Sequence, residues 1–110
     1  MEFPEFITRL PEAALPMPST TVKTHVLPSD KGQLVFFDII RSVELPPHSH
    51  GCQWGTVLEG EVEVTICTET RVYAPGNSYF IPAGVIHSAK APAGAKIIEF
   101  FEEPDRYHLR

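Results

Sequence analysis

Short runs of alternating apolar and polar residues set the structural expectation for this chain. Val62, Val64 and Ile66 alternate with acidic or hydroxyl-bearing neighbours, which is the period of two expected of a strand with one buried face. Residues 34–40 form a nearly continuous apolar run, and alternation returns over residues 43–45. This pattern predicts a strand that is buried on both faces and then becomes half-exposed.

Further strand-forming runs are separated by turn signals. Strands are also expected over residues 21–27, 57–59, 71–73, 78–81 and 96–101. Turns are expected at residues 28–32, 68–70, 74–77 and 91–94. The eleven prolines are spread along the chain and are difficult to fit into a mostly helical fold. No helix is expected, and the many short strands predict an all-β sandwich or barrel.

The length of 110 residues fits one domain with a core of its own. We divide the chain into an N-terminal arm over residues 1–20, a barrel over residues 21–103 and a C-terminal tail over residues 104–110. The apolar anchors of the arm are Phe3, Phe6, Ile7 and Leu10. The arm, which prolines interrupt, either lies over the domain's own surface or packs on a partner subunit. The tail is polar and is expected to be less ordered at its end.

Charge and composition exclude several classes of function. The net charge is −5 and the nine Lys and Arg residues form no basic run, so no nucleic-acid partner is expected. No stretch reaches the roughly 18–20 apolar residues that cross a bilayer, and the N-terminus does not resemble a secretory signal. We therefore expect no membrane partner and a cytoplasmic protein. Cys52 and Cys67 are expected to be free thiols.

Two stretches of the sequence carry candidate chemistry. His48 and His50 are two residues apart, so on a strand their side chains point to the same face. Two converging imidazoles are half of a site for a divalent transition metal, although such a pair could also be solvated or hydrogen-bonded at a strand edge. In the second stretch, Pro82 and Gly84 form a turn just before an apolar pair and His87.

These two stretches resemble the sequence motifs of the cupin family. Residues 76–87 match the second motif, G-x5-P-x-G-x2-H, at every defined position. Residues 42–60 resemble the first motif, G-x5-H-x-H-x(3,4)-E-x6-G, with His48 and His50 at its histidines and Gly60 at its last glycine. The resemblance covers most of the domain and implies a cupin-type jelly-roll β-barrel.

The resemblance also implies a ligand set and an assembly. In cupins, two histidines and a glutamate from the first motif and a histidine from the second bind a metal. This implies His48, His50 and His87 as metal ligands, with Gln53 at the glutamate position. The resemblance further implies a homodimer formed by strand exchange or by pairing of sheet edges.

The chain departs from the first motif around its acidic position. Gln53 replaces the glutamate, and the gap after His50 is one residue shorter than the pattern. Simple alternation would point Gln53 away from His50, so a bulge at residues 51–52 is one way to turn it inward. Gln53 would then either bind the metal through its carbonyl oxygen or orient a histidine or a water. Ser42 and Ala91 replace the first glycine of motif one and the last asparagine of motif two.

The glutamine has a consequence for charge. Three imidazoles and an amide are neutral, so they leave the full +2 charge on one divalent ion per chain, whether Zn, Ni, Fe, Mn, Co or Cu. Such a centre is a stronger Lewis acid than one with a carboxylate ligand, and it favours an anion. We therefore expect a small anionic molecule as the ligand.

Cys52, Phe80 and Phe100 are candidates to line an apolar pocket around the metal. For Phe80 and Phe100 the alternative is core packing. Cys52 could also be an alternative metal ligand or a reactive thiol, and the other alternative for it is a buried, inert thiol. Trp54 follows the candidate amide ligand and is expected on the opposite side, in core or interface packing.

Three functions remain open at this level. The chain could be a metalloenzyme of the oxygenase, isomerase or lyase type, and no acidic residue within the motifs stands out as a general base. It could instead be a non-catalytic module that binds a metabolite or a metal. It could also be a structural barrel that binds metal only adventitiously.

Overall fold

The computed structural model describes all 110 residues, and nine strands hold about half of them. The strands are β1 (Val22–Ser29), β2 (Gly32–Ile39), β3 (Val43–His48), β4 (Gln53–Glu59), β5 (Val62–Ile66), β6 (Glu69–Tyr73), β7 (Ser78–Ile81), β8 (His87–Ala91) and β9 (Lys96–Phe101). The only helix is α1 (Glu5–Thr8), a single turn in the arm that the sequence analysis did not anticipate. The expectation of an all-β fold is confirmed.

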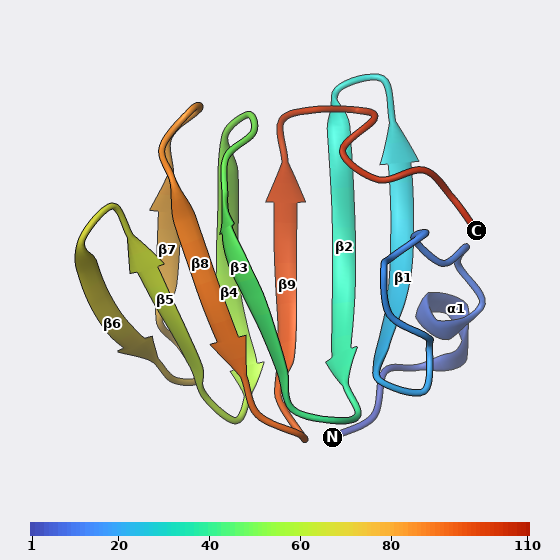
Figure 1. Ribbon diagram of the computed structural model, residues 1–110. Coiled ribbons are helices and arrows are strands. Elements are labelled where there is room, and N and C mark those ends of the chain that lie inside the picture. The colour runs from blue at the N-terminus through green and yellow to red at the C-terminus, as the bar shows by residue number, and fades with distance from the viewer.

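The strands form two antiparallel sheets. A five-stranded sheet has the order β1-β2-β9-β4-β7, and a four-stranded sheet has the order β3-β8-β5-β6. In Figure 1, β3 and β8 pass in front of β4 and β7, so the two sheets face each other as layers. Most of the connections after β2 cross from one layer to the other, as in a jelly roll. The core lies between the sheets and includes Val35, Phe37 and Ile97, which point inward from β2 and β9.

The sequence pattern located most strands to within a few residues but missed β8. Its sequence, HSAKA, contains no β-branched or large aromatic residue, so local propensity gives no strand signal. Tertiary pairing decides the outcome, because β8 lies between β3 and β5 and forms ladders with both.

The arm and the C-terminal segment pack together beside β1 (Figure 1). Ala13 is fully buried and forms an isolated β-bridge with Leu109. The Ala14 N–H donates to the His108 carbonyl at 2.7 Å, and the Val26 N–H of β1 donates to the Pro11 carbonyl at 2.8 Å. The arm therefore lies over its own domain, as in the first of the two expectations for it.

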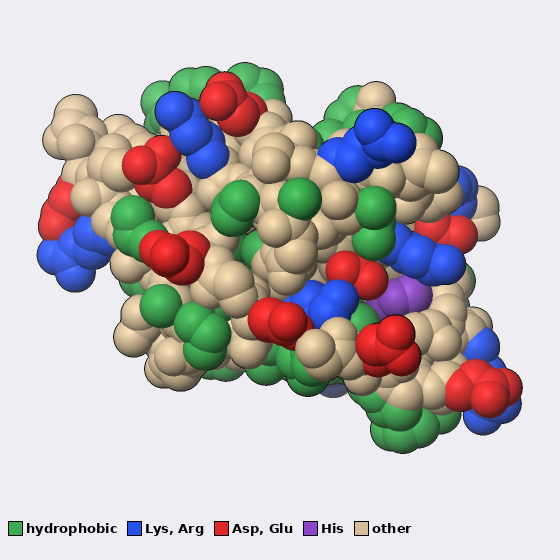
Figure 2. Space-filling view, turned by 90° about the horizontal axis from the view of Figure 1, so that it is seen from below, with side chains coloured by type: hydrophobic (Ala, Val, Ile, Leu, Met, Phe, Trp, Pro, Cys, Tyr) green, Lys and Arg blue, Asp and Glu red, His purple; other side chains and the backbone are tan.

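Charged side chains are mixed rather than grouped on the end of the barrel seen in Figure 2, where acidic and basic residues lie side by side. No part of the chain forms a helix of the length and apolar character needed to span a membrane.

Candidate metal centre

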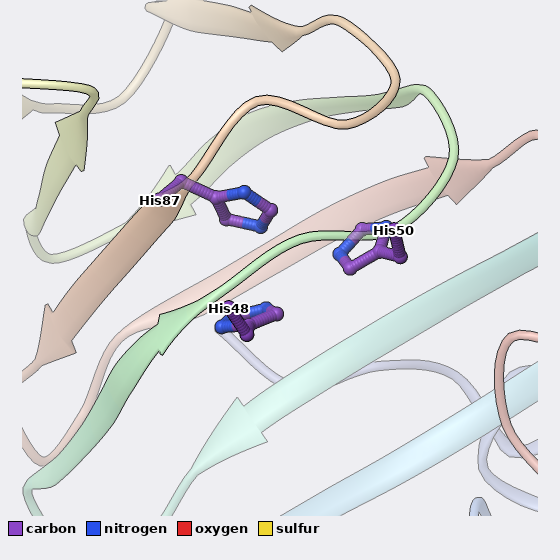
Figure 3. A group of neighbouring side chains, drawn as sticks. All are labelled: His48, His50 and His87. Atoms are coloured by element: carbon purple, nitrogen blue, oxygen red, sulfur yellow. The ribbon is translucent and has the colours of Figure 1, made fainter.

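Three histidines meet at the point where β3 and β8 pair. His48 is the last residue of β3, and in the ladder it is the partner of His87, the first residue of β8. His50 follows two residues after His48. The ring centroids lie 4.3 Å apart for His48 and His87, 4.9 Å for His50 and His87, and 5.3 Å for His48 and His50. Figure 3 shows the three rings directed toward a common space between the strands.

Each histidine ring is held by the same kind of hydrogen bond. The Nδ1 atoms of His48, His50 and His87 lie 2.8, 3.0 and 2.9 Å from the backbone carbonyls of Pro46, Gly51 and Val85. A carbonyl only accepts, so each Nδ1 carries the proton and each Nε2 is left with a free lone pair. The Nε2 atoms of His50 and His87 are buried and have no hydrogen-bond partner.

The surroundings favour the neutral form of two of these rings, His50 and His87. Burial lowers the pKa of His50 to about 4, and the nearby Arg106 and His87 act in the same direction. Burial also lowers the pKa of His87, against the hydrogen bond to the Val85 carbonyl. A metal ligand must be unprotonated. The trio therefore offers metal-binding lone pairs at neutral pH.

Gln53, the first residue of β4, is buried and lines the same cavity as the histidines. The expected bulge is not the reason that it points inward. Residues 49–52 carry the chain from β3 in one sheet to β4 in the facing sheet, so the alternation of one strand does not continue into the next. Its Nε2 donates a hydrogen bond to Oε2 of Glu99, and its Oε1 is buried without a partner. The amide is thereby oriented with its only metal-binding atom free.

Glu99 is the buried carboxyl group of the cavity, and the sequence analysis did not identify it. It points inward from β9 and accepts hydrogen bonds at Oε2 from the Gln53 amide and from the Tyr79 hydroxyl, the latter at 2.7 Å. Burial raises the pKa of Glu99, and these two hydrogen bonds oppose the shift. The signal in the sequence was incomplete. Glu99 shares a strand face with Ile97 and Phe101, but alternation alone does not show that this face points inward.

Gly55 makes room for the tyrosine that supports Glu99. A Cβ at position 55 would lie 2.4 Å from the ring carbon Cζ of Tyr79 and 2.5 Å from its hydroxyl oxygen. No side chain fits at that distance. The absence of a side chain on β4 therefore lets Tyr79 cross from β7 toward β9.

The cavity between the sheets has a volume of about 390 Å³ and is lined mostly by apolar side chains. Its polar lining consists of the histidine cluster, Gln53, Tyr79, Glu99 and three residues from the C-terminal segment, namely Arg106, Tyr107 and His108.

The guanidinium of Arg106 lies 4.4 Å from the ring centroid of Tyr107 and 5.5 Å from that of Phe101. Its Nε is buried without a partner, and no carboxylate lies within ion-pair distance of it. The tail is thus a wall of the cavity and supplies an unpaired cation.

The three candidate pocket residues lie elsewhere. Phe80 and Phe100 are 58% and 40% exposed, on the outer face of the five-stranded sheet. They occupy outward positions on β7 and β9, because their neighbours Tyr79, Ile81 and Phe101 take the inward ones. Cys52, a free and half-buried thiol, is also absent from the cavity lining.

The donor set fits a transition metal. One ligand atom from each of His48, His50 and His87 lies within 4.8 Å of the others. Two nitrogens bound to one ion at about 2.1 Å are at most about 4.2 Å apart, so a small inward movement of the rings completes the geometry. The unpartnered Nε2 and amide oxygen atoms are the groups that such an ion would satisfy.

Comparison with known proteins agrees with this geometry. The family model for the cupin domain matches residues 41–101, which is more than half of the chain, and the chain belongs to the cupin family. No protein of curated function matches it in sequence.

Solved structures show the same fold. An RmlC-like cupin from Shewanella frigidimarina is 27% identical, with a TM-score of 0.71 and coverage of 86% of each chain. KdgF from Halomonas sp. is 24% identical, with a TM-score of 0.70 and coverage of 86% of this chain and 88% of that one. A tryptophan-to-phenylalanine variant of Bacillus subtilis oxalate decarboxylase is 17% identical, with a TM-score of 0.72 and coverage of 90% of this chain and 29% of that one.

Proposed function

We propose that this cupin is a metal-dependent enzyme that acts on a small anionic metabolite by proton transfer, as an isomerase or a lyase. His48, His50, His87 and Gln53 hold one divalent transition metal ion. The observation that carries the proposal is the shared tautomer of the three histidines, with Nδ1–H fixed by backbone carbonyls and Nε2 free. A purely structural cluster would have no need for unpartnered buried nitrogens, which are costly to leave unsatisfied.

Two positive charges, Arg106 and the metal ion, favour the binding of an anionic ligand in the cavity. Arg106 lines the cavity without a carboxylate partner, and a neutral ligand set adds the undiminished charge of the metal. Apolar side chains form the rest of the wall and strengthen both attractions by excluding water. The metal, when bound, supplies Lewis acidity that polarises a substrate oxygen. One solved structure with this fold is named an oxalate decarboxylase, and a small acid of that kind is the class of ligand that these charges favour.

Proton transfer is assigned to Glu99. Its carboxyl group lines the cavity, and burial raises its pKa, which is a property of groups that hold and release a proton during catalysis. Both of its hydrogen bonds fall on Oε2, so Oε1 is free to carry a proton. This feature favours an isomerase or a lyase over an oxygenase.

The metal is tested by elemental analysis of protein purified without chelators. We expect near-stoichiometric transition metal in the parent, none in His48→Ala/His87→Ala, and the parent's content in His108→Ala, which removes a histidine outside the cluster. A metal-free parent that takes up no divalent ion on addition would overturn the proposal.

The anionic ligand is tested with the metal-loaded protein and a panel of small carboxylates and their neutral amides. Arg106→Gln should weaken carboxylate binding at least about tenfold without changing metal content, whereas Arg41→Gln, at an exposed loop position, should change neither. Equal binding of acids and amides by the parent would contradict the assignment of an anion.

The second candidate function is a binding module without turnover, favoured by the same cavity if Glu99 only supports Gln53. Glu99→Gln keeps the volume of the side chain and removes its proton. Loss of turnover with retained carboxylate binding supports the enzyme. Binding by the parent without turnover of any panel member, in the presence of each metal that loads, supports the module.

A further inference from the structure

The C-terminal segment turns back over the barrel directly after β9, and Arg106 lies in this turn. In Figure 1 the segment, drawn in red, passes from the end of β9 across the end of β2 toward β1. The Arg106 N–H donates to the Glu103 carbonyl at 3.3 Å. We call residues 102–107 the closing turn. Two residues whose side chains do not line the cavity, Glu103 and Gln33, fix its two ends.

Glu103 ties the closing turn to the loop that carries His50. Its Oε1 accepts the Gly51 N–H at 2.9 Å and lies 3.6 Å from Nδ1 of His50. One residue earlier, the Glu102 N–H donates to the Cys52 carbonyl at 2.9 Å. The loop between β3 and β4 is therefore bonded to the closing turn at two successive positions, and both lie within two residues of a metal ligand.

Gly51 allows the close approach of Glu103 because it has no side chain. A Cβ at position 51 would lie 2.8 Å from Cγ of Glu103 and 3.1 Å from its Cδ. The glutamate thus packs directly on the backbone of the loop. A carboxylate beside Nδ1 of His50 attracts the proton on that atom, as the Gly51 carbonyl does, and so favours the tautomer whose Nε2 is free for a metal.

Gln33 ties the other end of the closing turn to β2. Its Nε2 donates to the Tyr107 carbonyl at 2.8 Å, and its Oε1 accepts the Tyr107 N–H at 3.1 Å. A side chain that is 2% exposed thereby makes both hydrogen bonds of a β-ladder pair. Both backbone groups of Tyr107 are satisfied from inside the barrel, so the residue next to Arg106 has a fixed position.

The guanidinium of Arg106 depends on this fixed position. Its nearest planar neighbour is the Tyr107 ring, and guanidinium groups stack on aromatic faces. That ring packs in turn edge-on against Phe37 and Phe101, with centroid distances of 6.4 and 5.4 Å. Because the Nε of Arg106 has no hydrogen-bond partner, its place in the cavity is set by the backbone and by Tyr107. Movement of Tyr107 would carry the cation with it.

We propose that Glu103 and Gln33 are positioning residues, which hold the closing turn so that Arg106 and the metal ligand His50 keep fixed places in one cavity. This inference rests on the proposed function and deepens it, since neither residue touches metal or substrate. Glu103 acts on the metal through His50 and its loop. Gln33 acts on the anion through Tyr107 and Arg106. The two effects are separable because the anchors hold opposite ends of the turn.

The role of Gln33 is tested in Gln33→Met, which keeps the length of the side chain and removes both hydrogen bonds. Affinity for the tightest-binding carboxylate of the panel should fall about tenfold, whereas affinity for Zn²⁺, measured by chelator competition, should equal the parent's. In an Arg106→Gln background the same substitution should cause no further loss of carboxylate affinity, because its effect passes through the guanidinium. Equal losses in the two backgrounds, or a weakened Zn²⁺ affinity, would overturn this role.

The role of Glu103 is tested by Zn²⁺ affinity. Glu103→Ala should weaken it about tenfold, and Glu103→Gln, which keeps an acceptor oxygen for the Gly51 N–H, should restore most of the loss. Glu102→Ala is the matched control, because it removes an exposed acidic side chain from the same turn and leaves the backbone hydrogen bond to Cys52 in place. It should bind Zn²⁺ like the parent. Unchanged affinity in Glu103→Ala would refute this role.

Amide hydrogen exchange of the metal-free protein separates this inference from the proposed function. Exchange should accelerate about fivefold or more at Gly51 in Glu103→Ala and at Tyr107 in Gln33→Met. If the parent binds neither Zn²⁺ nor any carboxylate, the proposed function fails, while accelerated exchange at these two amides still supports the two anchors. If the parent binds both ligands and exchange changes at neither amide, the anchors are refuted and the proposed function stands.

Discussion

At the scale of single residues, the metal centre is prepared by backbone carbonyls. Each of the three histidines donates Nδ1–H to a carbonyl within two residues of itself in the chain. The tautomer is therefore fixed by local chain geometry before any metal arrives. A depressed histidine pKa accompanies this arrangement at His50 and His87, and it can be measured without metal.

His50 makes the folded state sensitive to acid. Its pKa is about 4 in the folded chain and about 6.5 when unfolded, so below pH 6.5 the unfolded state binds the extra proton. Stability is therefore present above pH 6.5 and is lost as the pH falls toward 4, by roughly 2–3 kcal/mol. Urea unfolding of metal-free protein should show a smaller loss between pH 7 and 4 in His50→Gln than in the parent. An unchanged slope in His50→Gln would contradict the shifted pKa.

Gln53 distinguishes this centre from one with a carboxylate ligand. In Gln53→Glu the amide N–H that Glu99 accepts is lost, and two carboxyl groups compete for one buried space. We expect the metal-free variant to be less stable than the parent by about 1–3 kcal/mol. Bound metal should restore this loss, because a cation neutralises the new charge.

Substitutions of Gln53 also show whether its side chain binds the metal or only orients a neighbouring group. If the Gln53 oxygen binds the metal, competition with a chromogenic chelator should show weaker metal affinity in Gln53→Ala and tighter affinity in Gln53→Glu. If Gln53 only supports Glu99, both substitutions should weaken the affinity, by about 10–100-fold at most.

At the scale of elements, three strands cooperate to build the support of Glu99. β4 contributes Gly55, β7 contributes Tyr79 and β9 contributes the carboxyl group itself. Gly55→Ala introduces a Cβ within 2.5 Å of the Tyr79 ring and hydroxyl, so the tyrosine must move away from Glu99. We expect destabilisation of about 1–3 kcal/mol from overpacking, together with loss of the Tyr79–Glu99 hydrogen bond.

Tyr79→Phe removes that hydrogen bond without a clash, and thermal unfolding should rank it between the parent and Gly55→Ala. Ser78→Ala, at an exposed position of the same strand, should match the parent. If Gly55→Ala were as stable as the parent, the close approach of β4 to Tyr79 would be refuted.

The sequence predicted strands and motif histidines, which depend on residues close together in the chain. It did not predict the direction of side chains, which depends on how the strands pack against one another. Alternation identified β5, a strand-forming run after a turn signal identified β9, and the spacing of the motifs identified His48, His50 and His87. The bulge expected before Gln53 was wrong, because the chain changes sheets there and alternation does not cross such a link. Phe80 and Phe100 were placed in the pocket because the sequence does not show which face of a strand points inward.

At the scale of the whole molecule, the C-terminal segment closes the barrel and completes the site. It binds the arm through the Ala13–Leu109 bridge, and it supplies Arg106 to the cavity. Nothing in its sequence distinguishes the segment from a disordered tail. The segment is ordered by its contacts with the barrel, where Tyr107 packs edge-on against Phe101 at a centroid distance of 5.4 Å. Arm, barrel and tail therefore pack together as one structural unit.

Because the arm, barrel and tail pack together, metal binding is expected to raise the free energy of unfolding of the whole chain. A ligand that binds only the folded state adds about 2.7 kcal/mol at a free concentration of 100 times its Kd. For a chain of this size that corresponds to a rise in Tm of about 10 °C or more. Calorimetry should show this rise in the parent on addition of the transition metal found by elemental analysis.

The His48→Ala/His87→Ala variant should show no such rise, and neither should the parent with Mg²⁺ or Ca²⁺, because these cations prefer oxygen ligands. An equal rise in the double variant would place the stabilising metal outside the histidine cluster. Because the cluster lies where β3 and β8 pair, and Gln53 lies on the facing sheet, a bound ion would join the two layers of the barrel. The shift should therefore appear as one cooperative transition moved to higher temperature, rather than as a second transition.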